Sequence, residues 1–460
     1  MEAAPRTRRA GAVVVTLTLA SLAYAVMQMM VVPALPEIER DLGSDAGGVA
    51  WLISAFLLST AVSTPVLGRL GDLFGKERML VAVLAVFACG GVVGALAPSL
   101  PVLIVARVMQ GLGGAIFPLS FAIARDTLPS ERLAPTLGLI SGSFGVGGAA
   151  GLVASGPIVD HVSWHGIFWL GIAMPLVAIV CVRLFVPPSP PRERVEVDWV
   201  GALLLAGGLL PPLLAVSRAR AWGWGAPGTL ALLAGGAIVL ALWARWELRR
   251  RAPLIDVRLL RVRAVATVNA VALCVGFGMY ATSYLVPQLV QADPAVAGFG
   301  FDASVTQAAF YLLPAMLAGL VCGPLAGSLC QRIGGRLPMA FGVAMLALGL
   351  ALLGFVHDER WQVYLGTLLA YGIGLTFALT AMAQLILTAV PQAQTGEATG
   401  INTMLRTVGG ALGSQVVATL VLGSSTRPTD DGFLIAFAAC AAVALVALAF
   451  CLLVPRPARR

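Results

Sequence analysis

Residues 68–78 read GRLGDLFGKER and gather charged side chains and glycines within a chain that is otherwise 59% hydrophobic and only 11% charged. The pair Gly75-Lys76 resembles the end of a phosphate-binding loop. That loop would require glycine where Leu70 stands and serine or threonine where Glu77 stands. The stretch is therefore interpreted as a charged connection between two apolar runs, and those runs decide the fold.

The apolar runs extend over the whole chain of 460 residues, whose mean hydropathy is +0.91. Soluble proteins carry about 25% charged residues, and about 20 apolar residues are needed for a helix to cross a bilayer. Long runs of this kind cross as helices, because a helix satisfies its own backbone in lipid. We expect fourteen spans, at 12–35, 49–68, 79–98, 101–124, 136–159, 166–187, 198–217, 228–246, 264–290, 304–328, 337–356, 361–388, 399–423 and 433–454.

Positive charge is unevenly distributed over the links between these spans. If the N-terminus is cytoplasmic, the inner links hold 23 of the 30 Lys and Arg residues and the outer links hold 5. Lys and Arg accumulate on the cytoplasmic side of membrane proteins. The sequence therefore predicts cytoplasmic N- and C-termini. The net charge of +8 reflects anchoring at a membrane surface, and no nucleic-acid partner is expected.

The chain contains an internal repeat. GSLCQRIGGR at 327–336 follows span ten as GRLGDLFGKER follows span two, and this alignment places Gly334 on Gly75 and Gln331 on Asp72. A repeated six-span unit is typical of transporters with a central site between the repeats. The predicted organisation is a six-helix half at 1–190, two inserted transmembrane helices with a basic inner linker at 191–263, and a second six-helix half at 264–460.

Ligands for metals and residues for catalysis are not grouped in the sequence. The seven cysteines lie singly in or beside apolar runs, and the three histidines form no metal-ligand pattern with acids or thiols. Such cysteines are expected to be packing residues. No metal site, no cofactor and no enzymatic activity are predicted.

Four segments resemble one known family, the major facilitator superfamily, and within it the fourteen-span drug:proton antiporter branch. The loop after span two is similar to the family signature at Gly68, Leu70, Asp72, Gly75, Lys76 and Arg78. Span four carries RVMQGLGG, with Arg107 and Gln110. Span five resembles the antiporter motif at Gly147, Gly151, Ser155 and Gly156, with Leu152 where the family has proline. Span thirteen and its start read GEATGINTMLRTVGGALG, which includes Arg406.

The resemblance implies an all-α integral membrane protein with the major facilitator fold, two six-helix halves and two extra central helices. It implies export of drugs or natural products in exchange for protons, by alternating access of the halves. Asp72 and its loop would form a cytoplasmic latch, and the span-five glycines would pack tightly on the span-eight equivalent. The branch usually has an acidic residue in the middle of span one, where this chain has Met27, and the sequence holds no Asp or Glu in the middle of any span. The coupling ion is therefore left open.

Two arginines lie inside the predicted spans, and a charge in lipid is expensive unless it faces the interior of the bundle. Arg107 and Gln110 share a helix face and are candidates for substrate contact or coupling, or else for a structural hydrogen-bonding role. Arg406 is a weaker candidate, because it could extend to the membrane surface. The candidates that line the cavity are polar or soft side chains on spans one and nine, namely Tyr24, Met27, Gln28, Asn269, Tyr280, Tyr284 and Gln288.

These observations favour a secondary active exporter of amphipathic or hydrophobic compounds in a bacterial cytoplasmic membrane. We expect a monomer whose partners are a small-molecule substrate, protons and the lipid bilayer. Among the basic residues, a single lysine accompanies 29 arginines, and alanine and glycine are abundant, which suggests a high-G+C bacterial genome. Two alternatives stay open, an importer or facilitator of a small anion or metabolite and a non-transporting membrane receptor. The sequence does not name the substrate.

Overall fold

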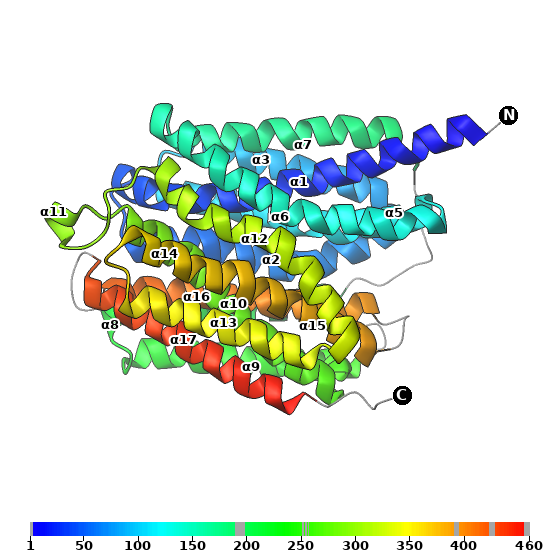
Figure 1. The fold of residues 1–460 in the computed structure, drawn as a ribbon. Helices are drawn as coiled ribbons and strands as arrows, with labels where there is room; N and C mark the ends of the chain where they lie inside the picture. Colours follow the sequence, from blue (N-terminus) through cyan, green and yellow to red (C-terminus); the bar gives the residue numbers. More distant parts are fainter. Residues whose placement is uncertain are drawn as a thin grey trace.

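The computed structural model describes residues 3–188, 198–250, 253, 255, 257–390, 395–422 and 428–454, and within these ranges it contains helices and no strand (Figure 1). The α-helices are α1 (Ala3–Asp41), α2 (Ala46–Phe74), α3 (Lys76–Ala95), α4 (Leu100–Gly111), α5 (Ile116–Thr127), α6 (Ser130–His161), α7 (His165–Phe185), α8 (Trp199–Trp222), α9 (Pro227–Arg249), α10 (Arg263–Val290), α11 (Pro294–Ala297), α12 (Val305–Ile333), α13 (Arg336–Phe355), α14 (Arg360–Thr367), α15 (Thr376–Ala389), α16 (Thr395–Leu422) and α17 (Asp430–Leu453). The shorter elements are the 3₁₀ segments η1 (Leu112–Ala115) and η2 (Val257–Arg261) and the π-helical segment η3 (Leu368–Leu375).

Thirteen of these helical segments are long and apolar enough to cross a membrane within the described part of the chain. They correspond to thirteen of the fourteen spans that the sequence predicts. The remaining expected span, 136–159, falls within α6, where several side chains lie outside the described residues. The all-helical membrane architecture is therefore confirmed.

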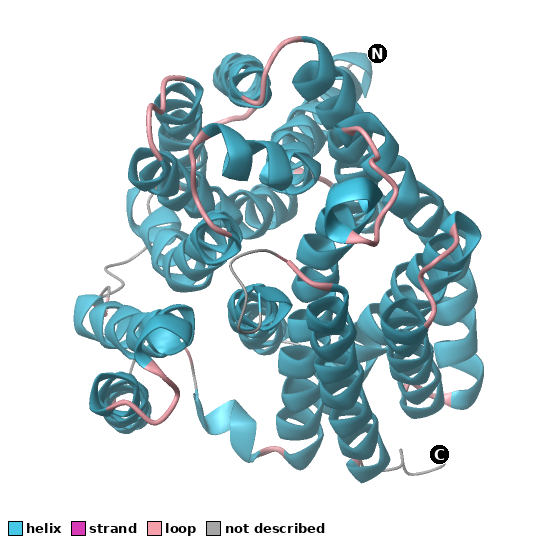
Figure 2. Ribbon diagram, turned by 90° about the vertical axis from the view of Figure 1, so that its left-hand side faces the viewer, coloured by secondary structure: helices cyan, strands magenta, loops and turns pink. Residues whose placement is uncertain are grey.

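The spans run side by side and form two groups (Figures 1 and 2). An N-terminal group comprises α1–α7, and a C-terminal group comprises α10–α17. The groups meet where α2 packs on α16 and α6 packs on α12, while α8 packs on the α2–α16 seam and α9 packs on α8. We call the end where α1 begins and α17 ends the terminal face, and the opposite end the far face.

The two groups repeat the same local irregularities. Gly75 between α2 and α3 has φ +98°, and Gly334 between α12 and α13 has φ +81°, which are backbone conformations that glycine adopts without strain. The fourth span of each group is also irregular, because η1 interrupts α4–α5 and η3 interrupts α14–α15. Gly75 and Gly334 are the two glycines that the alignment of 68–78 with 327–336 pairs.

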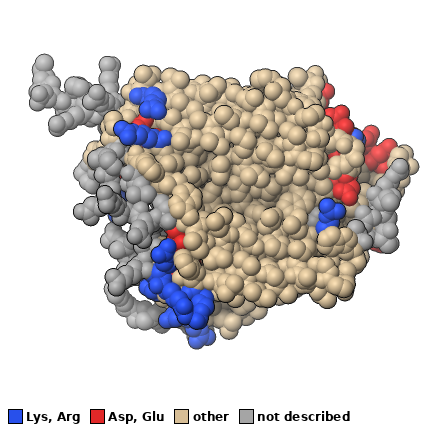
Figure 3. Space-filling model, turned by 180° about the vertical axis from the view of Figure 1, so that it is seen from behind, with Lys and Arg blue, Asp and Glu red and all other residues tan. Residues whose placement is uncertain are grey.

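Charge separates the two faces of the molecule. Figure 3 shows that the described Lys and Arg residues gather mainly at the terminal face, whereas most of the visible Asp and Glu residues lie at the far face. The surface between them is almost free of charge, as expected for the lipid-facing part of a membrane protein.

Candidate functional site

Arg107 lies deep inside its span, with 2% of its surface exposed. Its Nε donates to the carbonyl oxygen of Leu52 at 3.0 Å, and its Nη1 donates to Oε1 of Gln110 at 2.8 Å. The guanidinium carbon lies 4.2 Å from the ring centroid of Phe56, a cation–π distance. Among the described residues, Arg107 takes part in no ion pair. The buried guanidinium is therefore held by neutral groups, namely a backbone carbonyl, a side-chain amide and an aromatic ring.

The glycines that follow Gln110 explain how α4 reaches these partners. A side chain on Gly111 would meet the backbone oxygen of Phe56, and one on Gly114 would meet Thr60, so both positions require the smallest residue. Thr60 Oγ1 donates to the carbonyl oxygen of Gly111 at 2.9 Å, which ties α2 to the start of η1. A 3₁₀ turn inside a long helix often marks a functional hinge. The R-x-x-Q-G pattern therefore fixes Arg107 against α2.

Tyr24 joins α1 to this cluster. Its hydroxyl lies 3.4 Å from Thr60 Oγ1, its ring stacks on Phe56 with centroids 5.6 Å apart, and it meets Phe117 edge-on at 6.0 Å. Aromatic rings packed in this way hold their polar ends in defined positions. The Tyr24 ring and the Arg107 guanidinium thus both lie against Phe56.

A contact across the two groups lies beside Tyr24. Gln28 Nε2 donates to the Tyr280 hydroxyl at 2.7 Å, and this bond joins α1 to α10. Arg406, a half-buried residue of α16, packs its backbone on Gly276 of α10, one turn before Tyr280. The structure thus brings together five of the predicted site residues, which we call the central polar cluster: Tyr24, Gln28, Arg107, Tyr280 and Arg406.

Other predicted residues lie elsewhere. Met27, which we expected to line the cavity, is fully buried, and its side chain packs on Gly171 of α7 within the N-terminal group. Asn269 accepts a hydrogen bond from Asn402 Nδ2 at 3.0 Å, which is a contact within the C-terminal group. Because both faces of a membrane helix can be apolar, sequence pattern alone did not show that Met27 packs on α7.

Tyr284 and Gln288 belong to a closed contact near the far face. The Tyr284 hydroxyl donates to the carbonyl oxygen of Ala46 at 2.9 Å, and Gln288 Nε2 donates to Glu39 Oε2 at 3.0 Å. Gln291 Nε2 donates to the carbonyl oxygen of Pro33 at 2.9 Å. We call this set of bonds, from α10 to α1 and α2, the far-face contact.

Two further contacts, besides the far-face contact, join the N-terminal group to the C-terminal group. Asp160 at the end of α6 accepts from the backbone N–H groups of Val305 and Thr306, both at 3.1 Å, and so caps α12 of the other group. Ser54 of α2 lies 2.8 Å from Ser414 of α16, oxygen to oxygen. Together with the far-face contact and the Gln28–Tyr280 bond, these contacts join the two groups from the middle of the bundle to the far face.

The two carboxylates of this closure have different acidities. Burial raises the pKa of Glu39 above its ordinary value of 4.5, with repulsion by Asp45 adding to the rise and Gln288 and Arg40 opposing it. Burial also disfavours ionised Asp160, but its hydrogen bonds with α12 outweigh burial and hold its pKa below the ordinary value. Asp160 therefore stays ionised as the pH falls, whereas Glu39 is the first of the two to bind a proton.

Sequence reasoning missed Glu39. It lies in PEIERD, just past the first span, and looks like one of several solvated carboxylates there. Its burial depends on Gln288, which is 249 residues away in the chain. The only local signal was a carboxylate two turns beyond the hydrophobic run, which is too common a feature to single out one residue.

The signature loop lies at the terminal face. Lys76 Nζ pairs with Asp126 Oδ2 at 2.6 Å, and Arg183 pairs with Glu77 at 3.6 Å, so both contacts tie the loop to its own group. Gly75 makes the turn, Arg78 is exposed, and no atom lies near the open side of Gly68. The side chain of Asp72 lies outside the described residues, and its latch stays a prediction.

The span-five glycines pack on two neighbours. Side chains on Gly147 and Gly151 would meet α1, at Ala25 and at the carbonyl oxygen of Val26. The expected approach to the span-eight equivalent is made instead by Gly156, which lies against Thr306 of α12. Ser155 is fully buried between these contacts. The resemblance therefore gave the right helix pair but the wrong face for Gly147 and Gly151.

The chain is similar in sequence to a known family and to proteins of known role. Residues 17–414 match the sequence model of the Major Facilitator Superfamily. The chain is 30% identical over 390 residues to the Multidrug resistance protein Stp of Mycobacterium tuberculosis, covering 84% of this chain and 71% of that protein. It is 28% identical over 422 residues to the Tetracenomycin C resistance and export protein of Streptomyces glaucescens, covering 88% and 75%.

Solved structures share the fold at lower identity. A POT family transporter in complex with a thioalcohol conjugated peptide superposes with a TM-score of 0.70 at 15% identity, covering 96% of each chain. This likeness concerns the fold alone. The sequence relatives and the fold neighbour agree on one architecture.

Proposed function

Because the chain belongs to the major facilitator superfamily and is a multi-pass membrane transporter, we propose that it exports amphipathic and hydrophobic compounds across the bacterial cytoplasmic membrane. The observation that carries the proposal is the central polar cluster, which lies where α1 of one group meets α10 of the other. A few polar groups in apolar surroundings are the usual make-up of a small-molecule site. The drug and antibiotic exporters among the relatives support the outward direction.

The topology we propose has fourteen spans. It combines the thirteen apolar segments with α6, and it places the terminal face, with its Lys and Arg residues, in the cytoplasm (Figure 3). The units that move are residues 1–190 and 264–460, with 191–263 as the insert. Transport would then proceed by rocking of the two groups around the central polar cluster. The hydrogen bonds near the far face would make the structure a state closed to the outside.

The charge of the site suggests the kind of compound. Arg107 and Arg406 are the charges in the middle of the spans, and the sequence places no carboxylate there to oppose them. A fixed positive charge in a medium of low dielectric repels a cation and attracts an anion or a carbonyl oxygen. We therefore propose neutral or anionic aromatic compounds over lipophilic cations. The same observation favours a second candidate function, the import of a small anion.

A compound panel tests export and its direction together. In a host that lacks its own efflux pumps, expression should raise the inhibitory concentration of at least one amphipathic aromatic compound several-fold over an empty vector. Inverted vesicles should then accumulate that compound, because export runs into their lumen. The anionic dye fluorescein should be moved in preference to a cationic rhodamine. Protection by no compound would end the export proposal, and uptake into whole cells would favour the import of an anion.

Control of the outer closure by protons is the finer part of the proposal, and Glu39 is the residue we assign to it. In the closed far face, burial raises the pKa of Glu39. If opening exposes Glu39 to water, its pKa returns towards 4.5, so a bound proton favours the closed form. Protonation from outside would therefore promote closure of the outer side. The proton's preference for the closed form is complete when the outside pH lies below the ordinary pKa of Glu39. It is lost as the outside pH rises through the raised pKa.

We expect Glu39→Gln to remove this pH dependence. The amide can still accept from Gln288, so the contact survives while its titration is lost. In proteoliposomes, acidifying the outer side from neutral to mildly acidic should speed wild-type transport and leave the variant unchanged. Glu37→Gln is the matched control, because Glu37 is exposed and paired with Arg40 at 3.3 Å. An unaltered pH response in Glu39→Gln would assign this pH dependence to another group.

A further inference from the structure

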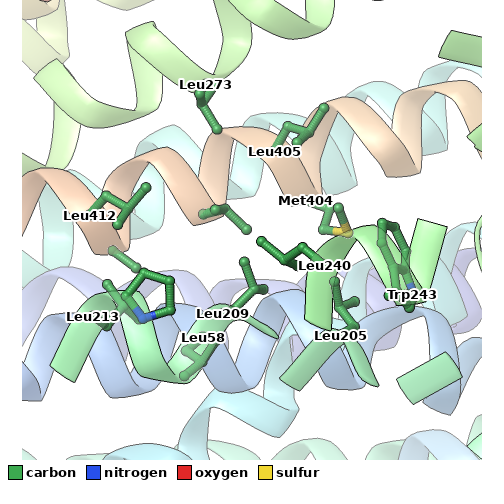
Figure 4. Close-up of a pocket in the computed structure, with 13 residues that line it drawn as sticks. Leu58, Leu205, Leu209, Leu213, Leu240, Trp243, Leu273, Met404, Leu405 and Leu412 are labelled. Atoms are coloured by element: carbon green, nitrogen blue, oxygen red, sulfur yellow. The ribbon is translucent and has the colours of Figure 1, made fainter. Parts of the chain in front are cut away.

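An apolar pocket of about 340 Å³ lies beside the transport core, between the insert and the seam of the two groups (Figure 4). Leu205, Leu209, Pro212 and Leu213 of α8 form one wall, and Leu240 and Trp243 of α9 close one end. The opposite wall is α16 from Met404 to Leu412, with Leu58 of α2 and Leu273 of α10 beside it. The pocket therefore touches both groups and the insert, and it is separate from the central polar cluster.

The lining of the pocket restricts its ligand. Among the thirteen lining residues only Trp243 carries a polar hydrogen-bonding group, its indole Nε1–H, whereas a site for a drug-like compound usually adds several polar groups that orient the ligand. In a membrane protein the apolar material at hand is lipid, whose chains need no hydrogen bond. The chemistry of the walls therefore fits a hydrocarbon chain.

Charge at the nearby terminal face defines the head of that ligand. Where α9 ends and α10 begins, the structure gathers an arginine cluster of described residues: Arg245, Arg249, Arg250, Arg258, Arg261 and Arg263. Arg249, Arg261 and Arg263 are exposed and take part in no ion pair among the described residues. Clusters of basic residues at the ends of transmembrane helices attract anionic phospholipids.

The arginine cluster and the pocket are connected by α9. Trp243 lines the pocket six residues before Arg249, and six helical residues rise about 9 Å. A phospholipid with its phosphate at the arginine cluster would thus have its chains beginning at the level of Trp243. Arg250 is held in place by Asp198, at 3.7 Å, and by the ring of Trp246, 4.9 Å from the guanidinium carbon. The end of α9 therefore presents its charges on a fixed frame.

We propose that this pocket binds one acyl chain of an anionic phospholipid whose headgroup lies on the arginine cluster. The ligand would bridge parts that move relative to each other. Ala411 lines the pocket and its carbonyl oxygen accepts a hydrogen bond from Ser54 of α2 at 3.1 Å, so the pocket adjoins the contact between the groups. A ligand shifts a conformational equilibrium by its difference in affinity for the two states. The lipid would accordingly favour the far-face-closed state.

Photolabelling of the full chain in lipid nanodiscs tests the proposal. The probes are phosphatidylglycerol and phosphatidylcholine that carry the same photoactivatable group in the middle of an acyl chain. Phosphatidylglycerol should label peptides of α8 and α16 that line the pocket, and phosphatidylcholine should label them much less. Equal labelling by the two lipids, or labelling confined to exposed helix faces, would overturn the proposal.

Two variants separate the chain from the headgroup. Leu209→Trp fills the pocket and should abolish the labelling, whereas Leu203→Trp on the same helix, where Leu203 is 73% exposed, should leave it unchanged. Replacing Arg249, Arg261 and Arg263 by glutamine should reduce the preference for phosphatidylglycerol by about fivefold for each arginine. Labelling that persists in Leu209→Trp would overturn the proposal, as would pocket labelling by a photoactivatable exported compound that excludes the lipid. The comparison of lipids on the wild-type chain decides the matter if a variant fails to fold.

Discussion

Arg107→Gln should reduce export by about 10- to 150-fold while the protein remains folded in the membrane. A charged hydrogen bond contributes about 1.5–3 kcal/mol, which corresponds to that range of rates if the bond is made to the substrate or in the coupling step. The structure explains why folding should survive. Arg107 has no ion pair among the described residues, so its removal leaves no buried carboxylate without a partner.

The measurement combines transport rates in proteoliposomes with thermal unfolding of the purified protein. Arg107→Lys keeps the charge but loses the forked donor, so it should recover part of the rate. Arg125→Gln is the control, because Arg125 is exposed at the end of the same span. If Arg107→Gln transports normally but unfolds at a clearly lower temperature, Arg107 acts as a structural hub that holds Leu52 and Gln110, and our assignment is wrong.

Much of the fold follows from the sequence because each span must satisfy the bilayer by itself. Run lengths and charge placement predicted the spans, and thirteen appear in the structure at the expected positions. The repeat was readable for a second reason. Gly75 and Gly334 both adopt positive φ, and a turn of this kind strongly favours glycine. Local requirements of this sort leave a direct trace in the sequence.

The site could be predicted only in part, because it depends on which face each helix presents. In lipid, an apolar residue suits both the bilayer and the protein interior, so hydropathy does not separate the two faces. Intramembrane arginines and tyrosines stood out by type, and the structure brings Tyr24, Gln28 and Tyr280 together across 252 residues. The contacts of Met27 and Glu39 could not be read from the sequence for the same reason, since they depend on partners on distant helices.

The insert shows a similar limit. Its two apolar spans and its arginines were evident in the sequence, but the pocket is not, because five helices form it together. Eight of the thirteen lining residues are leucines, and the others are Pro212, Trp243, Met404, Val408 and Ala411. The pocket arises from how α8, with α9 packed on it, lies against the α2–α16 seam, which is a property of packing between elements.

Gly151→Val should prevent stable assembly of the N-terminal group. A side chain at Gly151 would meet the backbone of Val26, and a backbone carbonyl cannot turn aside as a side chain can. Overpacking costs about 1–3 kcal/mol where neighbours can relax, so we expect at least the upper part of that range. The equivalent helix pair of the C-terminal group, α10 and α16, makes the same close approach, because Gly413 of α16 packs on the carbonyl oxygen of Phe277 of α10. Gly413→Val should fail in the same way.

The matched control for both variants is Gly235→Val on α9, where no atom lies within 4 Å of the added carbon. The same residue change there should leave the protein folded, so helix propensity alone is not the cause of any loss. Size-exclusion profiles and thermal unfolding of the three purified variants provide the readout. Gly151→Val with the stability of Gly235→Val would mean that α1 and α6 can separate without loss. The close approach of α6 to α1 would then have to serve movement of the groups, and its effect would appear in transport rates instead of stability.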